Sequence, residues 1–215
     1  MLAELYQRHQ AAFDRYQSLL LKWNEKINLT AITSPNEIAE RHFQDSLALI
    51  PALQAWGDSE NVSRETFSEG LSLLDLGAGG GFPGIPLKIA MPSWKVTLVD
   101  SVKKKCDFMK EVVRSLALSD VEIRHQALEP NQPLGPFDLV ITRAAFSLTK
   151  FLELGALHLN PSGRMVAYKG MEIEAEIKEA EETRLRHQLS PFKSYIYRLP
   201  VSKAQRQLIM TQSLS

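Results

Sequence analysis

The chain has 215 residues, 44% of them hydrophobic and 23% charged, which is ordinary for a soluble globular protein with one α/β domain and a small appendage. Its 25 basic residues balance 25 acidic ones, so it lacks the basic excess typical of nucleic-acid-binding proteins, although a local basic patch stays compatible with this balance. The single cysteine, Cys106, excludes an intramolecular disulfide. No apolar run approaches the ~18 residues of a membrane span, and charged residues within 1–10 lead us to expect no signal peptide there. We therefore expect a cytoplasmic protein.

Residues 1–57 are predicted to form a helical cap. Its apolar spacing predicts helices over 1–21, from 34 onward, and over 46–55. Asparagines within 22–30 favour a turn after the first helix. The second helix begins with the signature of a capping box, Ser34 and Glu37, and with Pro35 at its first position. The polar stretch 58–70 is expected to form a linker.

From residue 71 to 215 strands and helices alternate. The predicted strands are 71–77, 95–100, 121–125, 137–142 and 164–169, and the segments between them are helices at 86–90, 102–116 and 148–157 with a weak turn at 128–131. This rhythm predicts a parallel sheet with helices on both faces. A charged helix over 172–187 follows. The last two strands, 193–199 and 206–211, have no helix between them and should pair as a hairpin. One late antiparallel strand in a seven-stranded, mostly parallel sheet is the usual ending of a methyltransferase fold.

The most informative stretch is the glycine-rich turn that ends the first strand. Five glycines fall within eight positions, namely Gly77, Gly79, Gly80, Gly81 and Gly84. Glycine permits positive φ and lets a ligand approach the backbone, and the amides of a following helix attract negative charge. Asp100 ends the next strand 19 positions after Gly81, near the ~20-residue spacing of a carboxylate that binds a ribose. These features predict a site for a nucleoside-bearing cofactor.

Two registers of the glycines are compatible with such a site. From Asp75 the stretch reads D-x-G-x-G-x-G, through Gly77, Gly79 and Gly81, which is typical of Rossmann-like S-adenosylmethionine methyltransferases. From Gly79 it also reads G-x-G-x-x-G, the dinucleotide fingerprint, with Gly84 as its third glycine. The dinucleotide pattern has no leading acidic residue, and its third glycine falls here among prolines, where tight helix–strand packing should be awkward. The methyltransferase register therefore fits better.

Other candidate residues lie where the strands end, because open α/β sheets bind ligands there. Asp75 either braces the glycine loop as a structural cap or reaches the amino-acid end of the cofactor. Leu128 and Glu129 follow the third strand, where an adenine would stack, although Glu129 is equally plausible as a solvated side chain. Arg143 follows the fourth strand and is expected to position a purine or the cofactor. The alternative for Arg143 is a surface ion pair with Asp138 or Glu129.

The chemistry is narrowed by what the sequence lacks. The fourth strand is followed by Thr142-Arg143-Ala144 and not by the Asn/Asp-Pro-Pro-aromatic element that orients a target amine. Methylation of a cytosine carbon needs a cysteine nucleophile. The only candidate, Cys106, lies in the middle of a predicted helix, so this reaction is not expected. No cluster has metal-ligand spacing, so we expect no metal. Methylation of an already nucleophilic ring nitrogen remains, and it requires only that the acceptor and the sulfonium methyl be brought into line.

Two further sets of polar residues, the lysine run 103–105 and the pair His42 and Asp45, have both a functional and a structural interpretation. Lys103, Lys104 and Lys105 open a helix, where they oppose the macrodipole; this favours a phosphate partner, and a solvated charge run is nearly as plausible. His42 and Asp45 are i,i+3 neighbours, and we expect a mutual hydrogen bond without a further role.

Several motifs together resemble one family, the bacterial small-subunit ribosomal RNA guanine-N7 methyltransferases, also called glucose-inhibited division protein B. The resemblance covers about residues 20–169. It rests on Trp23-Asn24-Glu25-Lys26-Ile27-Asn28-Leu29-Thr30, Arg41-His42-x-x-Asp45-Ser46, Asp75-Leu76-Gly77-Ala78-Gly79-Gly80-Gly81-Phe82-Pro83-Gly84-Ile85-Pro86 and Thr142-Arg143-Ala144. It implies an N-terminal helical extension on a Rossmann-like methyltransferase domain, S-adenosylmethionine as the cofactor, and a guanine of the 16S decoding region in the small subunit or its precursor as the acceptor.

The resemblance also implies roles for single residues. It assigns cofactor contacts to Gly77, Phe82, Leu128, Glu129 and Arg143. It gives RNA contacts to Lys104, Lys105, Asn28 and His42. The sequence departs from the family pattern at Ala127, where some members have an arginine, so Arg143 is expected to carry the catalytic role. We expect a monomer. The alternatives are a small-molecule methyltransferase with the same cofactor and a non-catalytic RNA-binding assembly factor.

Overall fold

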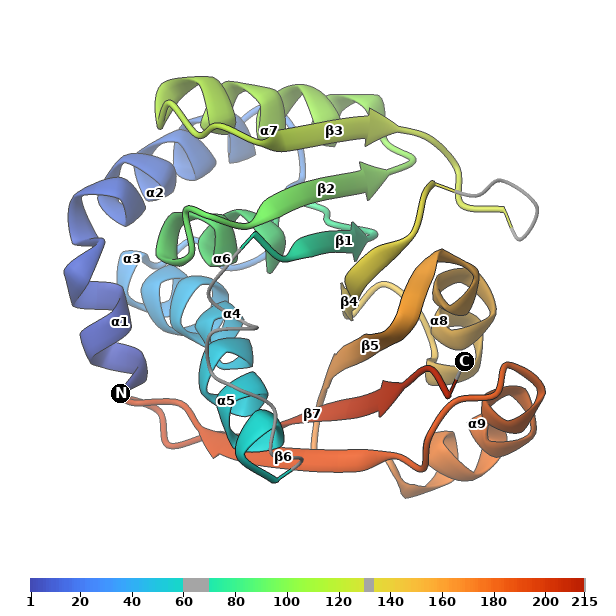
Figure 1. The fold of residues 1–215 in the computed structure, drawn as a ribbon. Coiled ribbons are helices and arrows are strands. Elements are labelled where there is room, and N and C mark those ends of the chain that lie inside the picture. Colours follow the sequence, from blue (N-terminus) through green and yellow to red (C-terminus); the bar gives the residue numbers. More distant parts are fainter. Residues whose placement is uncertain (60–69, 130–133, 215) are drawn as a thin grey trace.

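The computed structural model describes residues 1–59, 70–129 and 134–214. At its centre lies a seven-stranded sheet of order β3-β2-β1-β4-β5-β7-β6 (Figure 1). The strands are β1 (Ser72–Leu76), β2 (Lys95–Asp100), β3 (Val121–His125), β4 (Phe137–Arg143), β5 (Leu159–Lys169), β6 (Lys193–Arg198) and β7 (Gln205–Gln212). β7 pairs antiparallel with β5 and β6, and the other four pairings are parallel. The predicted mostly parallel sheet with a closing hairpin is confirmed.

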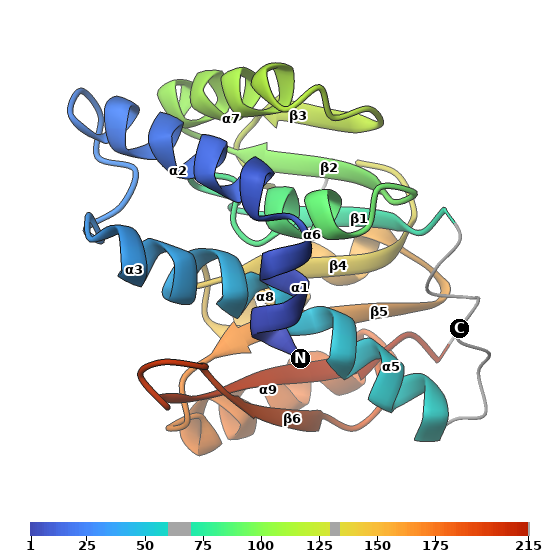
Figure 2. The same ribbon diagram turned by 90° about the vertical axis from the view of Figure 1, so that its left-hand side faces the viewer.

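Helices cover both faces of the sheet. On one face lie α1 (Leu2–Arg8), α2 (Gln10–Asn24), α3 (Pro35–Ile38), the π-helical turn η1 (Ala39–Gln44), α4 (Asp45–Leu47), α5 (Leu49–Ser59), α6 (Gly84–Ala90) and α7 (Lys103–Ser115), as Figure 2 shows for the N-terminal helices. On the other lie α8 (Leu148–Gly155), the short η3 (Ala156–His158) and α9 (Glu174–Arg186). No helix of the described segments is long and apolar enough to cross a membrane.

The strands divide their side chains between two cores because consecutive residues of a strand point to opposite faces. Leu73 and Leu139 face the helices of the N-terminal side, and their neighbours Leu74 and Val140 face α8 and α9. All four are essentially inaccessible to solvent. The N-terminal helices contribute Phe13, Tyr16 and other residues to the same core as the strands. They are therefore packed on the sheet and hold their position relative to the strand ends.

The single helix predicted over 1–21 is wrong in one respect, because the structure has two helices there, α1 and α2, separated at His9. His9 has φ −120° and ψ 20°, outside the helical region, and its carbonyl accepts from the first turn of α2. The break lets α1 pack against η1 and α4 while α2 packs against α7.

The helices predicted from 34 and over 46–55 form one nearly continuous helical run with a π turn at its centre. Pro35 occupies the first turn as predicted. The capping box is wrong: within the described residues the Ser34 side chain makes no capping hydrogen bond. The π turn carries Arg41 and His42, and such turns are frequent at functional sites.

Three further expectations concern segment boundaries. Helix α5 extends to Ser59, and most of the predicted linker, residues 60–69, lies outside the described residues. The weak turn predicted over 128–131 lies half outside them, and its described half, Leu128 and Glu129, is not helical. Strand β5 begins at Leu159, five residues before the predicted start at Arg164.

Candidate functional site

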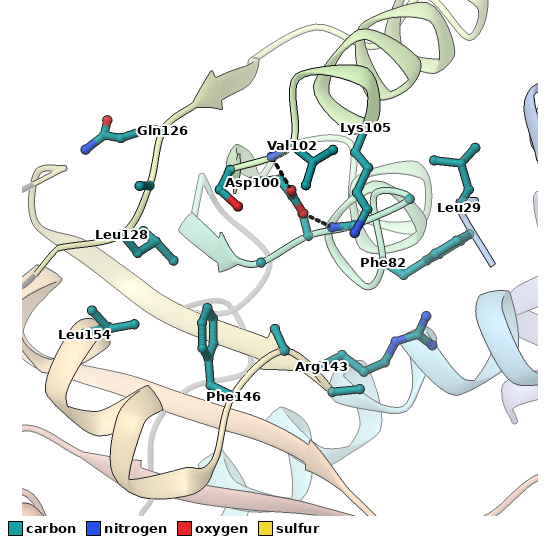
Figure 3. Close-up of a pocket in the computed structure, with 18 of the residues that line it drawn as sticks. Leu29, Phe82, Asp100, Val102, Lys105, Gln126, Leu128, Arg143, Phe146 and Leu154 are labelled. Carbon is teal, nitrogen blue, oxygen red and sulfur yellow. Dashed lines mark hydrogen bonds between the residues drawn. The ribbon is translucent and has the colours of Figure 1, made fainter. Parts of the chain in front are cut away.

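A cavity of about 600 Å³ opens where β1, β2 and β4 end (Figure 3). Its volume lies in the usual range for sites of small ligands and cofactors. At one end Leu128, Phe146 and Leu154 form an apolar wall. The glycine loop and Asp100 border its middle, and the other end is bordered by the side chains of Leu29, Phe82, Lys105 and Arg143. The cavity therefore combines an apolar pocket with a cationic one.

The glycine loop between β1 and α6 takes a backbone path that other residues would strain. Gly77, Gly79 and Gly81 have φ of +73°, +59° and +88°. A Cβ on Gly77 would lie 2.5 Å from the Cβ of Ala145, so only glycine lets the loop approach the end of β4 so closely. Gly77 and Gly79 border the cavity. Gly81 is also part of the loop but packs against the N-terminal helices, because a Cβ there would meet the Oη of Tyr16 at 2.6 Å.

Asp100 ties the loop to the next helix. Its Oδ2 accepts a hydrogen bond from the Gly79 amide at 2.9 Å, and its Oδ1 accepts from the Val102 amide at 2.8 Å, as the dashed lines in Figure 3 mark. A carboxylate has about four acceptor positions, so two remain after these bonds. The side chain borders the cavity at the end of β2. Asp100 thus fixes the loop and keeps acceptor positions free beside the cavity.

Asp75 lies behind the loop and is completely buried. Its Oδ2 accepts from the Gly84 amide at 2.8 Å, and its Oδ1 is buried with no hydrogen-bond partner among the described residues. Burial raises the pKa of Asp75 to about 7, partly offset by the Gly84 amide and by the charge of Arg143. This geometry matches the expectation that Asp75 braces the loop as a structural cap.

Gly84 corrects one argument made from the sequence. Its neighbouring prolines were expected to hinder close packing of helix and strand. In the structure a Cβ on Gly84 would lie 2.3 Å from Cδ2 of Leu98 in β2, so helix α6 packs on the strand too tightly for a side chain at this position. The proline argument against the dinucleotide register was therefore wrong, and the choice of register rests on other grounds.

Arg143 at the end of β4 is held by the segment that contains the π turn. Its Nη1 donates to the carbonyl of Arg41 at 3.1 Å and to Oδ2 of Asp45 at 3.2 Å. Its Nη2 lies 3.2 Å from Nδ1 of His42. The guanidinium carbon lies 5.1 Å from the centre of the Phe82 ring, in the range of a cation–π contact. Arg143 thus has a fixed orientation beside the cavity.

The surface pair considered for Arg143 is wrong. Asp138 instead accepts from the backbone amide and the hydroxyl of Ser72 and from the amide of Asn160, at the opposite end of β4. Glu129 is exposed, and the bonds of Arg143 within the described residues go elsewhere.

His42 is a neutral member of this cluster. Burial lowers the pKa of His42 to about 3, and the charges of Arg143 and Arg41 add to the effect. Because Arg143 can only donate, Nδ1 of His42 accepts, and Nε2 therefore carries the proton that is donated to Oγ1 of Thr30 at 2.8 Å. The ring stacks on Phe82 with 4.6 Å between centres. The predicted bond between His42 and Asp45 is wrong: each binds Arg143.

Comparison with known proteins identifies the family. The family model described as "rRNA small subunit methyltransferase G" matches residues 9–208. The chain belongs to this family. A ribosomal RNA small subunit methyltransferase G from Myxococcus xanthus is 42% identical over 90% of this chain and 83% of the relative. One from Carboxydothermus hydrogenoformans is 35% identical over 94% and 82%.

Solved structures show the same fold for this member of the methyltransferase G family. A methyltransferase from Pyrococcus furiosus gives a TM-score of 0.58 at 16% identity, over 96% of this chain and 98% of that one. A SAM dependent methyltransferase from Aquifex aeolicus gives 0.57 at 18% identity, over 84% and 94%. The Rossmann-like methyltransferase fold is confirmed.

The structure brings together only part of the set expected for a methyltransferase G. Leu128 lies in the described lining of the cavity, and Glu129 does not. Lys105 lies in that lining with its ammonium toward Phe82, whereas Lys104 and Asn28 are exposed and stand outside it. Glu129, predicted to contact the cofactor, and Lys104 and Asn28, predicted to contact RNA, are all exposed, and their contacts remain predictions.

Several lining residues were missed by the sequence reasoning. Phe146, Leu154 and Leu29 border the cavity without having been proposed. Phe146 comes three residues after Arg143, so the rule of strand ends applied a little further would have found it. Leu29 and Leu154 carry no such signal, because an aliphatic residue in a turn or helix reads as ordinary core.

A second cavity of about 270 Å³ lies on the other side of Arg143 in this methyltransferase. His42, Arg143 and Ala144 border both cavities. Residues from η1, β5 and the C-terminal hairpin complete the second one, including Arg41, Lys169, Tyr197 and Arg206. Within the described ranges, no group of three or more His, Cys, Asp or Glu side chains is arranged to hold a metal.

Proposed function

We propose that the protein transfers the methyl group of S-adenosylmethionine to N7 of a guanine in the decoding region of 16S ribosomal RNA. The substrate is the small ribosomal subunit or its precursor, in the cytoplasm. The names of the relatives support ribosomal RNA of the small subunit as the substrate. The observation that carries the proposal is the fixed Arg143 guanidinium, stacked on Phe82 beside the cavity at the ends of β1, β2 and β4.

The residues present fit this cofactor. Leu128 with Phe146 and Leu154 supplies an apolar wall for an adenine, and Asp100 keeps two acceptor positions for ribose hydroxyls. Gly77 and Gly79 leave their backbone bare along the middle of the cavity. When bound, the cofactor supplies an electrophilic sulfonium methyl. The protein's part is to hold that group and the acceptor in line.

Guanine N7 needs no general base, because its lone pair is free at neutral pH. The titratable side chains that border the cavity agree with methyl transfer that uses no general base. His42 has its Nδ1 occupied by Arg143, and both oxygens of Asp100 are bonded to backbone amides. Cationic donors, among them Lys105 and Arg143, also border the cavity. Cationic donors suit the O6 edge of guanine, where arginine and lysine form the commonest base contacts.

Residues outside the cavity are assigned by their exposure. Lys104 and Asn28 are exposed and available to RNA that extends beyond the acceptor. His42 borders the cavity, but it is buried and bonded on both ring nitrogens, so its role is to hold Arg143. Glu129 is exposed, which makes it the weakest of the proposed cofactor contacts. The catalytic assignment is Arg143, acting by position and charge.

Two measurements on the purified protein test the proposal. Isothermal titration with S-adenosylhomocysteine should give a binding signal that NAD does not give; the reverse result contradicts a methyltransferase. Small subunits from a strain that lacks the gene should accept labelled methyl from S-adenosylmethionine, and nuclease digestion should release the label as 7-methylguanosine. Label in a different nucleoside, or no transfer to the subunits, contradicts the proposed acceptor.

A further inference from the structure

The C-terminal hairpin reaches the active site through one hydroxyl. Tyr197 lies on β6, and its Oη donates to Oδ1 of Asp45 at 2.7 Å, across 152 positions of the chain. The other oxygen of the same carboxylate, Oδ2, accepts from Nη1 of Arg143 at 3.2 Å. The Asp45 carboxylate is therefore a bridge with one oxygen for each partner. Asp45 is buried and the Arg143 side chain is only 14% exposed, so solvent does little to replace either bond.

A second contact fixes the hairpin to the same helical run. The carboxylate of Glu40 is buried and its Oε1 accepts from the amides of Val201 and Ser202 at 2.5 and 2.7 Å. Those amides belong to the turn that joins β6 to β7. Glu40 stands five positions before Asp45, on the π turn that also supplies Arg41 and His42. The hairpin thus bonds the helical run both at Glu40 in the π turn and at Asp45 in α4, and the bond from Tyr197 to Asp45 is the one that leads to Arg143.

The orientation of Arg143 depends on this bridge. A guanidinium has five N–H donors in a rigid fork, and the contacts of Arg143 in the described chain use Nη1 and Nη2, on the side of residues 41–45. With these partners in place, the fork lies over the Phe82 ring. If Tyr197 loses its hydroxyl, the Asp45 carboxylate can rotate, and Arg143 loses a fixed anchor. The hydroxyl of Tyr197 is linked to Arg143 through Asp45.

We infer that Asp45 and Tyr197 are positioning residues for methyl transfer, and that the C-terminal hairpin completes the active site by fixing Arg143. The inference rests on the proposed function for its consequence in catalysis, and on the geometry alone for its effect on Arg143. Nothing in the motifs of the N-terminal two-thirds of the chain indicates a role for β6.

Tyr197→Phe tests the inference because it removes one oxygen and keeps the ring. Its matched control is Tyr195→Phe, which removes the same atom two positions earlier on the same strand, from a ring that stacks on Tyr197 with 6.5 Å between centres. The first measurement is the ¹⁵Nε–¹Hε signal of Arg143, assigned with Arg143→Lys, in the full chain. The second is kcat/KM for methyl transfer to small subunits.

We expect Tyr197→Phe to move the Arg143 signal and speed its guanidinium rotation, and to lower kcat/KM about 10-fold, the size of a typical coupling through one intermediate residue. Tyr195→Phe should do neither. In an Arg143→Lys background, Tyr197→Phe should have no further effect on kcat/KM. An Arg143 signal identical in Tyr197→Phe and wild type overturns the inference. The inference is also overturned if Tyr197→Phe lowers kcat/KM as much in the Arg143→Lys background as in the wild type. If the wild-type protein fails to methylate small subunits, the proposed function fails, and the Arg143 signal alone decides the inference.

Discussion

The guanidinium of Arg143 lies 5.1 Å from the centre of the Phe82 ring, although the two residues come from different strand ends of the sheet. Phe82 follows the glycine loop after β1, and Arg143 is the last residue of β4. Their contact joins the segment proposed to hold the cofactor to the side chain proposed to orient the acceptor. The same Phe82 ring also stacks on His42 and on Tyr16, at 4.6 and 5.3 Å between centres. The N-terminal helices are therefore part of the site.

Arg143→Lys should lower kcat/KM for methyl transfer by roughly 10- to 100-fold. Lysine keeps the charge opposite Asp45 but cannot reproduce the planar fork, and hydrogen bonds of charged groups are worth about 1.5–3 kcal/mol. The control is Arg114→Lys, which alters an exposed ion pair with Glu111 on α7. Steady-state kinetics on small subunits measures both. Equal kinetics for Arg143→Lys and wild type would remove Arg143 from the mechanism.

Gly77→Ala should weaken binding of S-adenosylhomocysteine at least 10-fold. The new Cβ would lie 2.5 Å from the Cβ of Ala145 at a φ of +73°, so either the loop or the end of β4 must move. The variant should also lose about 1–3 kcal/mol of unfolding free energy from the strained backbone. Gly170→Ala is the matched control, since a Cβ there meets no atom of the described chain within 4 Å. Calorimetry and chemical denaturation test both effects, and unchanged affinity in Gly77→Ala would contradict the placement of the loop.

Asp75→Asn should change how stability depends on pH. Burial raises the pKa of Asp75 to about 7, so between pH ~4 and 7 the folded state binds a proton that the unfolded state has lost. The contribution of this bound proton to the unfolding free energy is therefore complete below the pKa of Asp75 in the unfolded chain. It is lost as the pH rises through about 7. Asparagine keeps an acceptor for the Gly84 amide and carries no charge. The gain in unfolding free energy from Asp75→Asn should grow from pH 4 to 8, to on the order of a few kcal/mol.

The titration of His42 changes stability with pH in the direction opposite to that of Asp75. Burial lowers the pKa of His42 to about 3, so the stability contribution of neutral His42 is lost as the pH falls below ~6.5. Both proteins contain His42, and subtracting the wild-type curve from the Asp75→Asn curve removes its contribution. A difference between the two denaturation curves that stays constant from pH 4 to 8 would show that Asp75 does not titrate in this range.

Lys105→Ala and Lys104→Ala should differ. Lys105 borders the cavity and Lys104 is exposed, so only Lys105→Ala should lower kcat at saturating RNA. If each lysine binds one phosphate, either variant should reduce the slope of log affinity against log salt by about 1. Filter binding to a fragment of 16S ribosomal RNA at several salt concentrations measures the slopes. Exposed Lys203, in the turn between β6 and β7, provides a control of equal charge as Lys203→Ala.

Local patterns in the sequence predicted the strands and the place of the cavity proposed for the cofactor, because both depend on short segments. Apolar runs between helical segments placed all seven strands, and the rule of strand ends located the glycine loop, Asp100 and Arg143. The ion pair with Asp138, considered as an alternative role for Arg143, was wrong for a geometric reason. Asp138 stands five positions earlier on the same strand, which at about 3.3 Å per residue puts it roughly 16 Å away.

The true partners of Arg143 lie 98 to 102 positions away in the chain, and Tyr197 is 152 positions from Asp45. No local pattern reports such contacts, since they arise only when the N-terminal helices and the hairpin pack on the sheet. The break at His9 and the π turn at Ala39–Gln44 were missed for the same reason. Each gives up regular helix geometry for contacts with distant elements.

The most direct test is nucleoside mass spectrometry of 16S ribosomal RNA from a strain that lacks the gene, complemented with wild type or with Arg143→Lys. We predict that 7-methylguanosine at one decoding-region position disappears in the deletion, returns to its full level with wild type, and returns only in part with Arg143→Lys. A level of 7-methylguanosine that does not change on deletion would contradict the proposed acceptor.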